Sequence, residues 1–263
     1  MSRPPPRTIG TAPSGHGRTN PPDRIALGLR ARLLLGGLLT AVAGFVDAIG
    51  YIGLGGLFAS FMSAASVSLG VGVGDGSWGP VHQGGMMIAS FLGGVTLGTV
   101  LGGITGVWAL SAVLALEGLF LAGSALLATC DAALAISILP VVAAMGVQNT
   151  ALQSVSGVRL GVTFITGTLV SLGQALGQAL LGYPQTWPLG AHALPWAALM
   201  VGAATGAILH REFGPVALMA PAVLVTGLAM LSAAAALNAG SPTRRRPLPA
   251  GASRDRPIVW PHD

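Results

Sequence analysis

The stretch SFMSAASVSLG, from Ser60 to Gly70, lies in an otherwise apolar region, and a similar stretch, TFITGTLVSLG, occupies Thr163 to Gly173. Both begin with a hydroxyl residue and Phe, continue with small and hydroxyl residues, and end on Ser-Leu-Gly. Two such phrases roughly a hundred residues apart favour a chain built from two related halves. The Gly, Ser and Thr content of both segments fits either full membrane spans or broken, re-entrant helices.

The composition around these phrases is that of a polytopic membrane protein. Of the 263 residues, 52% are hydrophobic and 8% are charged, and the mean hydropathy is +0.73. Soluble domains have about a quarter of their residues charged. A soluble core cannot use so much apolar surface, so we expect an all-α polytopic membrane protein. Between Leu33 and His210 the charged residues are Asp47, Asp75, Glu117, Asp131 and Arg159.

Several functional classes are disfavoured by what the chain lacks. It contains no Lys, which excludes a Schiff-base lysine and a P-loop lysine. Its single Cys130 excludes disulfides and cysteine-rich metal sites within one chain. The arginines concentrate in the two tails, where they suit anionic lipid better than nucleic acid. We expect no enzymatic activity, cofactor, metal site or nucleic-acid partner.

The tails also predict an orientation. Residues 1–31 and 239–263 are rich in Pro and Arg without periodicity, and we expect both to be disordered, basic and cytoplasmic. They leave a membrane domain over residues 32–238, with halves at about 33–130 and 133–237. Two cytoplasmic tails require an even number of crossings.

Six apolar segments are long enough to cross a hydrocarbon layer about 30 Å thick. The two segments that contain the repeated phrase, Gly56–Val73 and Leu160–Leu181, are additional to these six. If both cross, the protein has eight spans and parallel halves, whereas if neither crosses, it has six spans and inverted halves. Arg159 would be cytoplasmic in the six-span arrangement and external in the eight-span one. Because arginines concentrate in cytoplasmic loops, Arg159 favours six spans. The six are Leu33–Leu54, Met86–Val107, Ala109–Thr129, Ala133–Val155, Ala193–His210 and Pro215–Leu237.

The duplication extends beyond the phrase. GFVDA, from Gly44 to Ala48, matches GVQNT, from Gly146 to Thr150, and pairs Asp47 with Asn149 at an offset of 102 positions (149 − 47). The phrases pair at an offset of 103 (166 − 63). A helix face of small residues in each half matches at an offset of 104 positions (202 − 98). Such faces are also common wherever helices pack closely in membranes. These helix-packing candidates are Gly94, Gly98, Gly102 and Gly106 in the first half and Ala198, Gly202 and Gly206 in the second.

The sequence AGFVDAIGYIGLGGLFASFMS, together with LALEGLFLAG, AMGVQNTAL and TGTLVSLG, resembles the YoaK family of bacterial multi-pass membrane proteins. The resemblance covers roughly Leu33 to Ala235. It implies an inner-membrane location and about six helices, and it supplies no substrate. Where that family usually has Thr/Ser-Gly-Asn-Thr, this chain has Ser63-Ala64-Ala65-Ser66.

Two intramembrane carboxylates are the main functional candidates. Glu117 lies near the middle of its predicted span, and Asp47 lies about four residues, or ~6 Å, beyond the middle of the first. A charge at such depth costs on the order of 2.5–3.5 kcal/mol, so these residues are candidates for proton coupling. The alternative is a protonated carboxyl group that is hydrogen-bonded to a neighbouring helix.

Neutral hydrogen-bonding side chains complete the candidate site. In a broken helix they can line a cavity and bind a small polar solute, or they can bond carbonyl groups of their own helix. We therefore predict a permease-like protein that moves a small solute with protons. The alternative is a membrane scaffold whose glycine faces bind a partner. Candidate partners are the lipid bilayer, a small polar solute or proton, and a second copy of the chain. The neutral candidates are Ser63, Ser66, Gln148, Asn149, Thr166 and Thr168.

Overall fold

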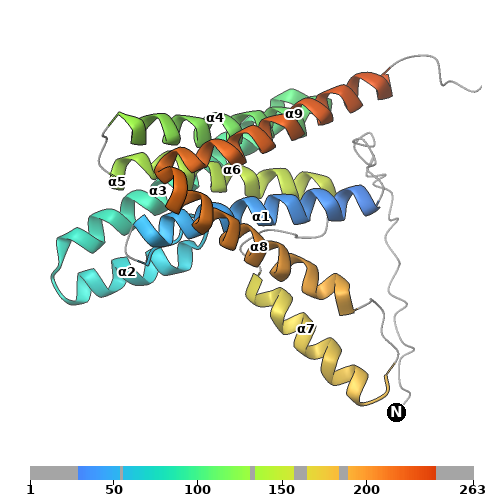
Figure 1. Cartoon of the computed structure of the whole chain (residues 1–263), viewed down its shortest axis with the longest axis horizontal. Coiled ribbons are helices and arrows are strands. Elements are labelled where there is room, and N and C mark those ends of the chain that lie inside the picture. The colour runs from blue at the N-terminus through green and yellow to red at the C-terminus, as the bar shows by residue number, and fades with distance from the viewer. Residues whose placement is uncertain (1–28, 54–55, 131–133, 157–164, 184–188, 241–263) are drawn as a thin grey trace, which may run out of the picture.

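A computed structural model describes residues 29–53, 56–130, 134–156, 165–183 and 189–240. All regular structure in these ranges is helical (Figure 1). The elements are α1 (Leu29–Gly53), α2 (Met62–Gly74), α3 (Trp78–Thr105), η1 (Gly106–Trp108), α4 (Ala109–Thr129), α5 (Leu134–Ser137), α6 (Leu139–Ser156), α7 (Ile165–Leu180), α8 (Leu189–Phe213), η3 (Gly214–Leu218) and α9 (Met219–Gly240).

The helix boundaries differ from the predicted ones in three places that matter, and one of these is the predicted span Ala133–Val155, which is divided into α5 and α6. Helix α1 begins at Leu29, so the last residues of the predicted N-terminal tail are helical. Residues 1–28 and 241–263 of the predicted tails, and Arg159, lie outside the described residues. Helix α3 begins at Trp78 rather than Met86 because Pro80 lies in its first turn, where a backbone N–H is not needed.

Three described stretches are long and apolar enough to cross a membrane. They are Leu33–Gly53 in α1, Trp78–Thr129, which contains α3 and α4, and Ala193–Asn238, which contains α8 and α9. Helix α2 is apolar but only 13 residues long, which at 1.5 Å per residue is about 20 Å and too short for a full crossing.

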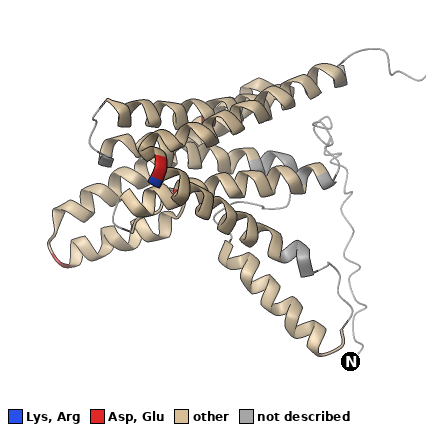
Figure 2. Ribbon diagram, viewed as in Figure 1, with Lys and Arg blue, Asp and Glu red and all other residues tan. Residues whose placement is uncertain are grey.

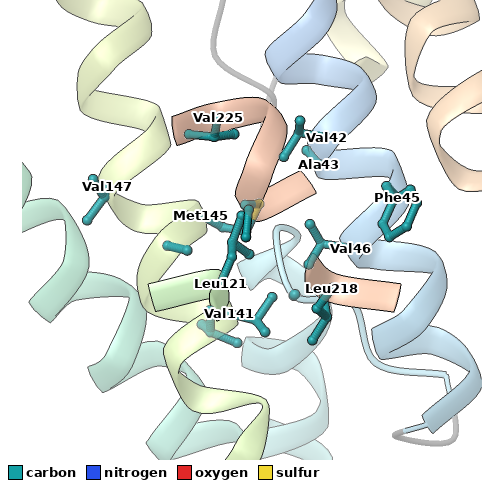
Figure 3. Close-up of a cluster of buried hydrophobic side chains, with 14 of the residues drawn as sticks. Val42, Ala43, Phe45, Val46, Leu121, Val141, Met145, Val147, Leu218 and Val225 are labelled. Carbon is teal, nitrogen blue, oxygen red and sulfur yellow. The ribbon is translucent and has the colours of Figure 1, made fainter. Parts of the chain in front are cut away.

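The centre of the molecule is a bundle of α1, α4, α6 and α9. Helix α4 packs against both α6 and α9, and its own buried side chains include Leu114 and Leu121. Figure 3 shows Leu121 of α4, Met145 of α6, Val46 of α1 and Leu218 of η3 meeting between the ribbons. Each of these four side chains is buried. This apolar centre surrounds the polar groups described below.

Two helical arms leave the bundle at opposite ends. Helix α2 forms an antiparallel hairpin with the first half of α3, because Gly72 and Gly84 lie against the partner helix. Helix α7 pairs with α8 in a second hairpin. Figure 1 shows the α2–α3 turn at the end where α1 finishes, and the α7–α8 turn at the end where α1 starts. Helix α9 also finishes at the latter end (Figure 1).

Backbone glycines hold the long helices in close contact. A Cβ atom added at Gly202 of α8 would meet the Ala41 carbonyl oxygen of α1, and one added at Gly206 would meet that of Phe45. On the other side, an added Cβ at Gly94 of α3 would meet the Ala143 carbonyl oxygen of α6. In both pairs the contacts advance in the same direction along the two chains, so α1 runs parallel to α8 and α3 runs parallel to α6.

Most of the predicted glycine face is therefore a packing surface, with two corrections. Gly98 packs against Val147 and Thr150 of α6, whereas Gly102 makes only ordinary contacts with the start of α4. Gly106 packs against nothing within 4 Å and has a φ of 56°, a left-handed conformation that glycine adopts without strain. It ends α3 and allows the turn into α4.

Few of the residues that Figure 2 colours by type are charged. Among side chains that the structure describes, Asp75 lies just after α2, and Arg211 pairs with Glu212 at 2.9 Å on the surface. The remaining charged side chains there are Asp47 and Glu117, both buried. The apolar outer surface suits a lipid environment.

Candidate functional site

Glu117 is the most isolated polar group in the described part of the chain. It lies on α4 one turn before Leu121, and none of its surface is exposed. Neither carboxyl oxygen has a hydrogen-bond partner among the described residues. The next residue, Gly118, lets α9 approach closely, since an added Cβ there would meet the Thr226 hydroxyl. Burying a polar group without a hydrogen bond costs from about 1 kcal/mol to several kcal/mol. A carboxyl group with only a structural role would therefore be expected to have a hydrogen-bond partner.

Gln148 adds a second buried group with unused hydrogen-bonding capacity. It lies on α6, which packs against α4, and it is fully buried. Its Nε2 donates to the Leu39 carbonyl oxygen of α1 at 2.8 Å, which fixes the side chain between α1 and α6. Its Oε1 has no partner among the described residues. The bundle thus holds an amide oxygen and a carboxyl group that can still bind a proton, water or a polar solute.

Asp47 has a different role. It lies on α1 and is 4% exposed. The backbone N–H of Ser60 donates to its Oδ1 at 2.7 Å, and the Ser60 hydroxyl donates to its Oδ2 at 2.5 Å. These two bonds hold the segment before α2 against α1, two turns before α1 ends. The chain therefore lies back against α1 before α2 begins.

Ser60 is the buried partner of Asp47 that the sequence did not predict. It is the first residue of the repeated phrase and is 1% exposed. The available signal was a hydroxyl residue 13 positions after an intramembrane carboxylate, at the start of a Gly- and Ser-rich break. That spacing crosses a chain reversal, so no helical periodicity relates the two residues.

The other predicted polar residues are not gathered at this centre. Ser63 and Ser66 lie on exposed faces of α2, and the Ser66 hydroxyl donates to the Met62 carbonyl oxygen. Thr166 is exposed on α7, and Thr168 donates to the Ile165 carbonyl oxygen. Ser63 and Ser66 lie on α2 and Thr166 and Thr168 lie on α7, in the two separate arms (Figure 1), so the structure does not bring these four hydroxyl groups together.

Asn149 likewise bonds locally, from its Nδ2 to the Met145 carbonyl oxygen at 2.8 Å. Of the eight predicted polar site residues, the central bundle contains Asp47, Glu117, Gln148 and Asn149. Only Glu117 and Gln148 among these have buried oxygen atoms without a partner in the described residues.

The fold and its buried polar groups define the class: this is an all-helical integral membrane protein. Residues 35–231 match the family model described as "Protein of unknown function (DUF1275)". The chain belongs to this family, which confirms the resemblance to YoaK.

Two relatives are both described as UPF0700 transmembrane proteins. The UPF0700 transmembrane protein YoaK of Bacillus subtilis (strain 168) is 30% identical over 203 residues, which cover 73% of this chain and 90% of that protein. The UPF0700 transmembrane protein RA0705 of Rhizobium meliloti (strain 1021) is 37% identical over 90 residues, which cover 33% of this chain and 39% of RA0705. No solved structure matches the chain.

Proposed function

We propose that this protein is a permease of the bacterial inner membrane that moves a small polar solute together with a proton. It is not an enzyme, both termini are cytoplasmic, and Glu117 carries the proton. The observation that carries the proposal is the fully buried Glu117 carboxyl group, with no partner for either oxygen among the described residues. Intramembrane carboxyl groups of this kind are characteristic of proton relays in transporters.

The proposal includes two inverted three-span halves, each with one re-entrant segment. Contacts between helices recur at fixed offsets, which supports it. Gly44 lies against Leu199 and Ala203, and Gly146 lies against Phe91 and Val95. Gly146 lies 102 positions after Gly44 (146 − 44). Their partner residues, Leu199 and Phe91, are 108 positions apart (199 − 91). The match of α3 with α8 is therefore at 108, rather than the 104 expected from sequence.

The turns recur in the same way. Gly106 and Gly214, also 108 positions apart (214 − 106), have φ values of 56° and 59° and each ends a long helix. Gly76 and Gly182 have φ values of 68° and 77°, and each lies at the tip of an arm. Helices α1 and α6 run in opposite directions in Figure 1, as do α3 and α8. Inverted halves of this kind are common in transporters, with the site between the halves.

The scaffold alternative loses its main surface. It required the glycine faces to bind a partner, but Gly94, Gly98, Gly202 and Gly206 are buried against helices of the same chain. A second copy of the chain would have to bind elsewhere.

Proton entry into reconstituted vesicles tests the function. Wild-type protein and the Glu117→Gln variant are incorporated into vesicles that contain a trapped pH-sensitive dye, under an imposed pH gradient. The control is Glu212→Gln, which alters an exposed carboxylate paired with Arg211. We expect wild-type and Glu212→Gln vesicles to acidify faster than empty vesicles, and Glu117→Gln vesicles to match the empty ones. Equal acidification by wild-type and Glu117→Gln protein would overturn the proposal.

A further inference from the structure

A small cavity lies at the end of the bundle where α1, α4 and α8 finish. Its volume is about 220 Å³, and α1, α4, α5, α8 and η3 all contribute to its wall. Ile49, Ile138 and Leu218 supply apolar surface, and Ser124, Ser137 and His210 supply polar atoms. The cavity therefore lies at the end of the bundle opposite the start of α1. In the proposed orientation the start of α1 is cytoplasmic, so the cavity lies at the external end.

The cavity has polar groups that can bind a solute. His210 Nδ1 is buried and has no partner among the described residues. The Ser124 hydroxyl, which is 1% exposed, donates to the Ser137 carbonyl oxygen and retains its oxygen as an acceptor. A neutral imidazole nitrogen can accept or donate, depending on its tautomer. Both residues line the cavity, His210 from α8 and Ser124 from α4.

The chemistry of the wall selects an uncharged ligand. None of its described residues carries a formal charge, apart from the titratable His210, and the neighbouring Arg211 is paired with Glu212 on the surface. A charged solute would lose its hydration there without an opposite charge to compensate. With a water molecule occupying about 30 Å³, the cavity has room for roughly seven waters, or one small solute.

The cavity also lies on the way to the buried carboxyl group. Ser124 is seven residues beyond Glu117 on α4, a distance of about 10 Å along the helix. Ile49 is two residues beyond Asp47 on α1. A solute in the cavity would be two helical turns from Glu117.

We propose that this cavity is the binding site for a small uncharged polar solute with hydroxyl or amide donors. This inference rests on the proposed function, because it names the class of solute that the permease would move. The hydrogen bonds come from His210 and Ser124, and Ile49, Ile138 and Leu218 enclose the carbon skeleton.

Protection of a cysteine in the cavity wall tests the site. In a Cys130→Ser background, Ala128→Cys places a thiol in the wall, and Leu127→Cys places one on the neighbouring exposed position outside it. The purified proteins react with methyl methanethiosulfonate, and the probes are glycerol, urea and acetamide. We expect at least one probe to slow the reaction of Ala128→Cys in a saturable way and to leave Leu127→Cys unaffected. No protection, or equal protection of both variants, would overturn the proposal.

A second substitution separates the site from a general solvent effect. His210→Ala added to Ala128→Cys should raise the half-protecting probe concentration about fivefold or more, since it removes one buried hydrogen bond. Arg211→Ala, one residue further along and outside the wall, should leave it unchanged. Unchanged protection in His210→Ala would contradict the assignment. Protection by a probe in protein that conducts no protons would support the cavity site and reject the proton-coupled function.

Discussion

At the scale of single residues, the two intramembrane carboxyl groups are not equivalent. Asp47 is bonded twice to Ser60, whereas Glu117 is bonded to nothing in the described residues. A carboxylate that accepts a backbone N–H and a hydroxyl fixes the position of the segment that donates them. Asp47 therefore positions the chain before α2, whereas both carboxyl oxygens of Glu117 are without a partner among the described residues.

Removing the Asp47 side chain should loosen this segment. Asp47→Ala leaves the buried Ser60 N–H and hydroxyl without an acceptor, so we expect a loss of about 1.5–3 kcal/mol in the free energy of unfolding. Ser60→Ala removes only one of the two bonds and should cost less. Denaturant titrations of both variants in detergent measure these losses. An Asp47→Ala variant as stable as wild type would show that the two bonds do not hold the segment.

Depth in the membrane could be predicted for both carboxyl groups, but their bonding could not. Hydropathy places Asp47 and Glu117 within spans because each interrupts a long apolar run. Whether a partner exists depends on chain reversals such as the one between Gly53 and Ser60, which carry no periodic signal. The sequence therefore predicted Asp47 as a candidate residue but did not predict that Ser60 is its hydrogen-bond partner.

At the scale of helices, glycine determines which pairs come into contact. Gly202 and Gly206 bring α8 onto α1, and Gly94 and Gly98 bring α3 onto α6. Each pair therefore joins a helix of one half to a helix of the other half. Small residues favour such close backbone approach in membranes, where packing rather than water expulsion drives helix association.

A bulky residue at one of these contacts should separate the helices. Gly202→Leu places its Cβ against the Ala41 carbonyl group, so we expect a loss of about 1–3 kcal/mol or more in the free energy of unfolding, with reduced yield of folded protein. Gly98→Leu should act similarly on α3 and α6. Gly93→Leu is the matched control, because nothing lies within 4 Å of its added Cβ. Equal thermal stability of Gly202→Leu and Gly93→Leu would contradict these contacts.

A row of glycines predicts a packing face but not its partner helix. Gly94, Gly98, Gly102 and Gly106 have one spacing, yet Gly98 contacts α6 and Gly106 ends the helix. The spacing does not reveal that Gly106 has a positive φ, which ends the face. The same reason explains why the proposed match of α3 with α8 has an offset of 108 and not 104, since alignment by spacing alone also allows a shift of one turn.

At the scale of the whole molecule, the proposed topology depends on the two arms. The start of α1 and the end of α9 lie at the same end of the molecule as the end of α7, whereas the α2–α3 turn lies at the opposite end (Figure 1). The composition was sufficient to predict an all-helical membrane protein. It could not decide between six and eight crossings, because α2 and α7 are apolar whether or not they cross. The number of crossings depends on where the chain turns before α2. That turn is held by the tertiary contact between Ser60 and Asp47.

The most direct test of the inverted arrangement is the sidedness of the two arm tips. In a Cys130→Ser background, Ser77→Cys and Tyr183→Cys each place one thiol at an exposed tip. Cells are treated with a membrane-impermeant maleimide before and after lysis. The inverted six-span account predicts that Ser77→Cys is labelled in intact cells and Tyr183→Cys only after lysis. Protection of both variants until lysis would mean eight crossings and parallel halves, and would contradict the account.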